Sequence, residues 1–132
     1  MAKTILVMFP MQAGKELLDL LDETEFDVRV AAWIYNREED EWKFTLASPF
    51  IEKNGALTAF RLLQTLLPKL PRHDEALRQM TLSDISLRGY KEYFTREFFR
   101  IVHVGREDPP QLMRLASIEG VPVDEAYVYR SI

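Results

Sequence analysis

The pattern of apolar and polar residues is clearest between Phe26 and Pro49, where the chain reads FDVRVAAWIYNREEDEWKFTLASP. Two runs rich in β-branched and aromatic residues flank a short acidic segment, and this pattern predicts a β-hairpin. Pairing Asn36 with Glu41 across a four-residue loop sets the register of the two strands. In this register, one face of the hairpin carries Ala31, Trp33, Tyr35, Trp42, Phe44 and Leu46.

The opposite face of this hairpin is also largely apolar. It carries Val30, Ala32, Ile34, Thr45 and Ala47, with Lys43 among them. Such a sheet is either covered on both sides or covered on one side, with an aromatic surface left exposed on the other. The first arrangement is the more common, because most apolar sheet faces belong to a core.

Two segments have the apolar spacing of amphipathic helices. The first runs from about Met11 to Glu23, and its apolar side holds Leu17, Leu18, Leu20 and Leu21. The second runs from about Ala56 to Leu67, and the prolines that follow it end the helix. Its main apolar stripe consists of Leu57, Phe60, Leu63 and Leu67.

The second half of the chain returns to β-like texture. Strands are expected within Leu82–Leu87 and Phe98–Val104, and Gln111–Ile118 is expected to pair with Glu125–Arg130. Arg72–Met80 is predicted to be a short helix or an ordered linker. Together these elements predict an α+β fold, with two principal helices packed on a mostly antiparallel sheet.

Composition supports one globular domain over residues 1–132, because this length builds a single core. Hydrophobic residues make up 47% and charged residues 29%, as is typical of folded proteins. The net charge of −4 disfavours a broad nucleic-acid footprint. The absence of cysteine fits a cytoplasmic location. The apolar start Thr4–Phe9 is too short to span a membrane, so no membrane association is expected.

The titratable residues show no spacing that is typical of a catalytic or metal site. Asp27 and Glu41 resemble the acids of a metal-dependent nuclease, but they lie at opposite ends of the hairpin, more than about 20 Å apart. We therefore expect no metal and no cofactor. If the protein is catalytic, the residues to test first are Glu97, Arg100 and His103.

Aromatic and basic residues alternate between Tyr90 and Arg100, and this composition can stack bases and hold phosphates. Glu92 and Glu97 interrupt the cluster, and aromatic residues in a β-like region are more often core. Nucleic-acid binding is thus a less favoured alternative that stays open.

Three motifs resemble a group of small uncharacterised prokaryotic proteins. They are AAWIY at 31–35, WKFTLASP at 42–49 and DEAYVYR at 124–130. The resemblance implies a fold but no activity. In the last motif, Tyr127 and Tyr129 share one side of a strand.

These observations predict a non-catalytic interaction or accessory protein that binds a second copy of itself, as a homodimer, or another protein. The contact would use a sheet edge or an exposed aromatic surface. The candidate surface residues are Trp33, Tyr35, Trp42, Phe44, Tyr127 and Tyr129. The alternative is an enzyme or nucleic-acid-processing factor whose site forms only in three dimensions.

Overall fold

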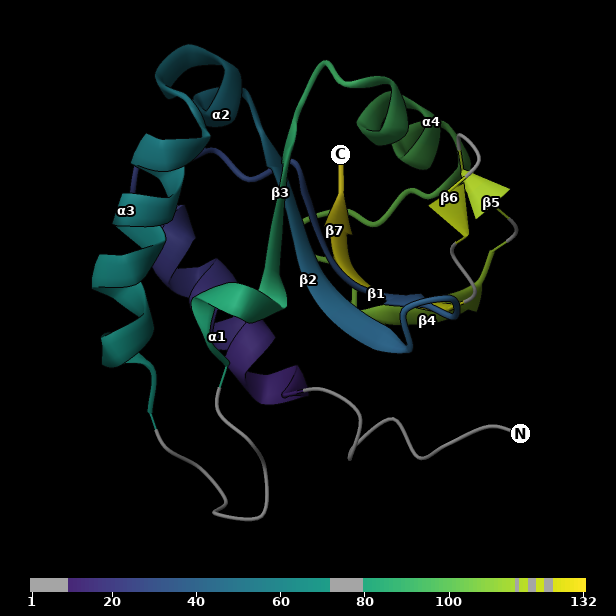
Figure 1. The fold of residues 1–132 in the computed structure, drawn as a ribbon, viewed down its shortest axis with the longest axis horizontal. Helices are drawn as coiled ribbons and strands as arrows, with labels where there is room; N and C mark the ends of the chain where they lie inside the picture. Colours follow the sequence, from purple (N-terminus) through teal and green to yellow (C-terminus); the bar gives the residue numbers. More distant parts are fainter. Residues whose placement is uncertain (1–9, 72–79, 116, 119–120, 123–124) are drawn as a thin grey trace.

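The computed structural model of the chain describes residues 10–71, 80–115, 117–118, 121–122 and 125–132. The helices are α1 Met11–Asp22, α2 Pro49–Asn54, α3 Ala56–Leu66 and α4 Tyr93–Ile101, with 3₁₀ turns η2 Leu67–Lys69 and η3 Leu82–Asp84. The strands are β1 Val30–Asn36, β2 Glu41–Ser48, β3 Ile85–Gly89, β4 Gln111–Arg114, β5 Ser117–Ile118, β6 Val121–Pro122 and β7 Glu125–Ser131. Figure 1 shows their arrangement.

The main sheet has five strands in the order β3-β2-β1-β7-β4, while β5 and β6 form a separate small pair. The hairpin of β1 and β2 has the predicted register, in which Tyr35 lies opposite Trp42 and Asn36 opposite Glu41. The predicted pairing of Gln111–Ile118 with the last strand is confirmed for Gln111–Arg114, because β4 is antiparallel to β7, whereas Ser117–Ile118 pairs with β6. Only β3 is parallel to its neighbour, β2. The predicted α+β class with a mostly antiparallel sheet is thus confirmed.

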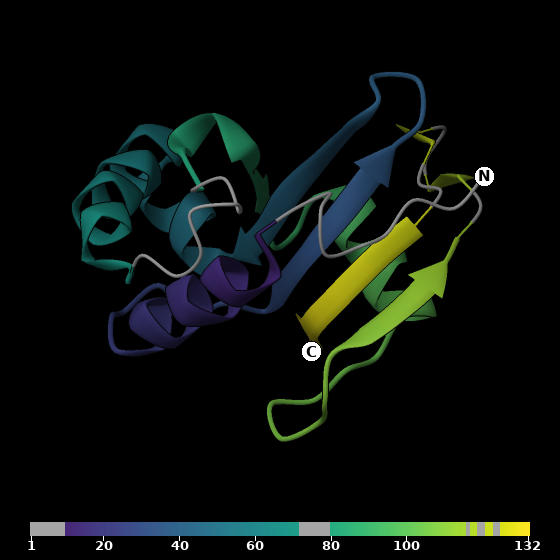
Figure 2. The ribbon, with the colours of Figure 1, turned by 90° about the horizontal axis from the view of Figure 1, so that it is seen from below.

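Helices cover both faces of the sheet (Figures 1 and 2). On one face, side chains of α1 and α3 pack against aromatic residues of the sheet. On the other face, α4 packs against the small and branched residues of β1 and β7. The two apolar faces predicted for the hairpin therefore belong to two cores, one on each side of the sheet.

Ser48 joins the end of β2 to the helices that follow. Its hydroxyl accepts a hydrogen bond from the Phe50 amide at 2.9 Å, so it caps α2. The same hydroxyl donates to the carbonyl of Phe26. This pair of contacts fixes where α2 and α3 leave the sheet.

The buried side of α3 differs from the predicted stripe. Ala59, Leu63 and Leu66 are buried, whereas Phe60 is half-buried and Leu57 is 64% exposed. The apolar stripe of this helix is wider than the part that packs on the sheet. The sequence pattern therefore did not decide which side of the stripe faces the core. Leu57 is thus left outside the core, whereas Phe60 packs at its margin.

The predicted strand Phe98–Val104 is wrong, because most of this segment belongs to α4. Phe94 and Phe98, four residues apart, are both buried against the sheet, which is the spacing of a helix face. A high content of aromatic and branched residues suggested a strand. After the helix, Val104 forms an isolated bridge with Ser131.

Two predicted segments lie outside the residues that the structure describes. They are the apolar start Thr4–Phe9 and, except for Met80, the predicted helix or linker Arg72–Met80.

Candidate functional site

The aromatic residues expected at a binding surface lie mainly in the core. Trp33 and Phe44 are fully buried, and Trp42 and Tyr129 are nearly so. They pack with α1 and α3 in one hydrophobic cluster, and Tyr35 and Tyr127 are half-buried at its margin. The four buried side chains therefore do not form an exposed aromatic surface. The aromatic face of the hairpin is buried by α1 and α3 of the same chain.

Tyr129 is tied to the start of α1. Its hydroxyl donates a hydrogen bond to the Met11 carbonyl at 2.5 Å, and its burial raises the pKa of the phenol. Gly14 allows this close approach, because a Cβ there would lie 2.7 Å from both the Tyr129 hydroxyl and Trp33 Nε1. This arrangement is a packing contact between α1 and the sheet.

Glu97, Arg100 and His103, the residues named for possible catalysis, lie on and after α4. Glu97 and Arg100 form an ion pair at 2.9 Å, and this contact lowers the pKa of Glu97. His103 is exposed and its ring meets Phe99 edge to face, with centroids 4.7 Å apart. None of the three residues lines either of the two cavities described below. They form local helix contacts and no common site.

The aromatic and basic cluster 90–100 is split by the helix. Phe94 and Phe98 point into the core, while Tyr93 is exposed with the Arg96 guanidinium 5.6 Å from its ring centre. The helix thus buries two of the five rings in this cluster, and Tyr90, Tyr93 and Phe99 are exposed or half-buried.

A polar cavity of about 480 Å³ lies between α1, the segment before β1 and the end of β7. Its inner wall is Arg130, which is 5% exposed and donates two hydrogen bonds of 2.8 Å to the Asp22 carboxylate. These hydrogen bonds are the main reason that the pKa of Asp22 is lowered. Arg106 lies 3.9 Å from Asp22 and 3.8 Å from Asp27. These arginines and carboxylates all contact a partner of opposite charge within the chain, so we assign this network a structural role.

Asp27 is one of the two acids considered for a nuclease site, and it takes part in this network. Arg29 donates to its carboxylate at 3.0 Å and lowers the pKa of that carboxyl. Because the predicted register of the hairpin is correct, Glu41 lies at the far end of β2. The structure therefore keeps the two acids apart.

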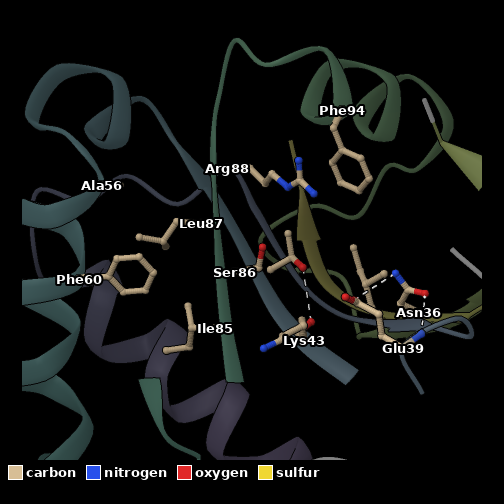
Figure 3. Close-up of a pocket in the computed structure, with 12 residues that line it drawn as sticks. Asn36, Glu39, Lys43, Ala56, Phe60, Ile85, Ser86, Leu87, Arg88 and Phe94 are labelled. Atoms are coloured by element: carbon tan, nitrogen blue, oxygen red, sulfur yellow. Dashed lines mark hydrogen bonds between the residues drawn. The ribbon is translucent and has the colours of Figure 1, made fainter. Parts of the chain in front are cut away.

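The second cavity is a groove of about 400 Å³ that runs along β3 (Figure 3). We call it the β3 groove. Its lining residues are Ile34, Asn36, Glu39, Lys43, Thr45, Ala56, Phe60, Ile85, Ser86, Leu87, Arg88 and Phe94. Among the described residues, β3 pairs with β2 alone and forms one edge of the sheet. An edge strand carries backbone N–H and C=O groups that point away from the sheet.

The two sides of the β3 groove differ in polarity. Ile85 and Leu87 project to the side where Phe60 of α3 lies, so this wall is apolar. In Figure 1, α3 lies beside β3 on the side away from β2. Ser86 and Arg88 project to the other side, where Lys43 lies. The alternation along β3 thus separates an apolar wall from a polar wall.

Lys43 and Arg88 supply the positive charge of the polar wall. The Lys43 ammonium donates to the Ser83 carbonyl at 2.5 Å and lies 3.9 Å from Glu41. The Arg88 guanidinium lies 4.4 Å from the Phe94 ring centre and 3.5 Å from Glu92. An ammonium has three donors and a guanidinium five, so both groups have donors beyond these contacts. Glu39 is the one carboxylate among the residues that line this groove.

The described residues include no group of three or more histidine, aspartate or glutamate side chains placed to hold a metal ion. In the same part of the chain, no helix has the length and apolar content needed to cross a membrane.

Comparisons with protein-family models, curated proteins and solved structures find no match for this chain. The function must therefore be argued from its own residues. Sequence reasoning missed the β3 groove, because nothing in the sequence shows that β3 joins β2 in parallel. One signal was available: α3 carries more apolar side chains than a single sheet face needs.

Proposed function

We propose that this chain is a non-catalytic interaction protein that binds another polypeptide at the open edge of β3. The observation that carries the proposal is the position of that edge, along a groove between α3 and the polar wall. Open edge strands bind extended segments by adding a strand to the sheet, and main-chain hydrogen bonds supply much of the affinity. We also propose a cytoplasmic location, because a chain without cysteine needs no oxidising compartment to form disulfides.

Two features support the β3 edge over an aromatic surface. The large aromatic side chains of the hairpin are covered by α1 and α3, so little aromatic area of the sheet is left to bind a partner. The residues named for catalysis do not gather around a cavity. Phe60, which is half-buried at the margin of the core, lines the β3 groove, and Leu57 of the same helix is 64% exposed.

Photo-cross-linking tests this proposal. A photoreactive residue at Ser86, inside the β3 groove, is compared with the same residue at Gln111, on the edge strand at the opposite end of the sheet. The proposal predicts covalent protein adducts from position 86 and none from position 111. Equal labelling from both positions, or none from position 86, would contradict it.

Self-association as a homodimer is one form that this interaction can take. Light scattering over a range of concentrations measures it directly. A clean monomer at high micromolar concentration would rule out the homodimer and leave a different protein as the partner.

A further inference from the structure

The junction of α2 and α3 contains the only Asn-Gly pair of the chain, Asn54 and Gly55. We propose that Asn54 is a site of spontaneous deamidation, where the Gly55 amide nitrogen attacks the Asn54 side chain when the last turn of α2 opens. The product is aspartate or isoaspartate at position 54. This inference is independent of the proposed function, because it concerns the covalent chemistry of the chain itself.

The reaction uses the peptide nitrogen that follows the asparagine as the nucleophile. A bond forms between the Gly55 nitrogen and Cγ of Asn54, and the bond from Cγ to Nδ2 breaks. The side-chain amide leaves as ammonia and takes the proton of the Gly55 N–H with it. Water then adds to either carbonyl of the cyclic imide and opens the ring to aspartate or isoaspartate. Water is the only other reactant.

Gly55 hinders this attack less than any other residue would. It has no Cβ to shield its nitrogen. Among the described residues, no atom beyond its two chain neighbours lies within 4 Å of the position that a Cβ would take. Asn54 is exposed, so water reaches its side chain. The steric requirements of both steps are therefore met at this junction.

Two hydrogen bonds restrain the reacting groups while α2 is intact. The Gly55 amide donates to the Ile51 carbonyl at 2.8 Å, and Asn54 Nδ2 donates to the Phe50 carbonyl at 3.3 Å. Both bonds must break before the attack, so the reaction starts from an opened turn. Helix ends with few buried contacts open most readily. The helix has six residues and Phe50, in its first turn, is the buried one, so its last turn opens with little loss of core packing.

The other asparagine of the chain, Asn36, provides an internal control. Arg37 follows it, and the side chain of this residue hinders the same attack. The Asn36 Oδ1 accepts hydrogen bonds from the amides of Glu38 and Glu39 at 2.9 and 3.3 Å, which hold the side chain in the hairpin loop. We therefore expect Asn36 to stay intact over the time in which Asn54 reacts.

Deamidation alters the start of α3. It makes the net charge of −4 more negative by one. Isoaspartate also adds a main-chain carbon directly before Gly55, the residue that caps the N-terminus of α3. Ala56, the next residue, lines the β3 groove. The modification therefore falls where the chain enters one wall of that groove.

Tryptic peptide mapping of the folded protein, incubated at mildly alkaline pH, tests the inference. Trypsin cuts after Lys53 and Arg61 and after Arg29 and Arg37, so residues 54–61 and 30–37 report on the two asparagines separately. We expect the 54–61 peptide to yield two products with the mass of the acid, and isoaspartate-specific methylation should label one of them. The 30–37 peptide should stay unchanged. Ion exchange of the whole protein should show an acidic variant that Asn54→Gln abolishes.

The same incubation in guanidinium chloride tests the part played by α2. The unfolded chain should deamidate at position 54 faster than the folded protein, because the two helix bonds are gone. Equal rates in both states would contradict the restraint by the helix. A 54–61 peptide that stays unchanged, conversion at Asn36 equal to that at Asn54, or an acidic variant that persists in Asn54→Gln would overturn the inference.

Discussion

At the scale of single residues, two positions link distant parts of the chain. Gly14 lets α1 approach the sheet closely, because its missing side chain makes room for Trp33 and Tyr129. Arg130 is buried near the end of the chain and takes its counter-charge from Asp22 at the end of α1. Neither contact follows from spacing in the sequence, since the partners lie far apart in the chain. Both therefore yield predictions that only the structure provides.

Gly14→Ala should destabilise the protein although alanine favours a helix. The new Cβ would lie 2.7 Å from Trp33 Nε1 and from the Tyr129 hydroxyl, and both side chains are held in the core. Overpacking of this kind costs about 1–3 kcal/mol, against a helix-propensity gain of up to about 1 kcal/mol. We expect a net loss of about 1–2 kcal/mol in urea unfolding. Gly105→Ala, which would meet only the exposed Asp108 carboxylate, is the control and should change little.

Asp22→Asn should destabilise the protein in a pH-dependent way. The pKa of Asp22 is below its ordinary value of 3.8 when the protein is folded. The stabilisation is therefore complete above that value and is lost as the pH falls through the folded-state pKa. At pH 7 we expect a loss of about 3 kcal/mol, because Arg130 is left buried without its counter-charge. The difference from the parent protein should shrink below about pH 4.

Thermal unfolding at pH 7 and pH 3 measures this difference. Asp19→Asn is the matched control, because Asp19 forms an exposed pair with Lys15 and should change stability by less than about 0.5 kcal/mol. A difference between Asp22→Asn and the parent that stays the same at both pH values would contradict the assignment.

At the scale of elements, local patterns predicted the hairpin and the first two long helices. The register of β1 and β2 followed from alternation and loop length alone, because these act between neighbours in the chain. The direction that α3 faces did not follow, because its apolar stripe is wider than the surface it covers. For α4, aromatic content suggested a strand, while Phe94 and Phe98 at a spacing of four carried the correct signal.

Because α4 covers the second face of the sheet, alanine substitutions on its buried and exposed sides should differ clearly in their cost to stability. Phe98 is fully buried and Ile101 is 49% exposed. Phe98→Ala should cost about 3–4 kcal/mol, because it leaves a cavity between α4 and β7, whereas Ile101→Ala should cost less than about 1 kcal/mol. Chemical unfolding of both variants checks this. Similar losses from the two substitutions would mean that the helix packs on a different side.

At the scale of the whole molecule, the sheet is covered on both faces and open along β3. The sequence predicted both apolar faces and a possible sheet-edge contact, but it did not identify the edge. That edge depends on the parallel pairing of β2 with β3, which joins segments separated by α2, α3 and the turns that follow them. The groove exists because this long connection returns the chain beside α3.

The openness of the β3 edge is the central claim, and residue-resolved amide hydrogen exchange in the dilute protein tests it most directly. In a parallel edge strand, alternate N–H groups bond to the neighbouring strand and the others point outward. Because the Ile85 amide bonds to the Leu82 carbonyl and the Gly89 amide bonds to the Glu92 carboxylate, we predict fast exchange at the Leu87 amide and slow exchange along β1, which is paired on both sides. Uniform slow exchange across β3, equal to that of β1, would show that the edge is already covered and would contradict the account.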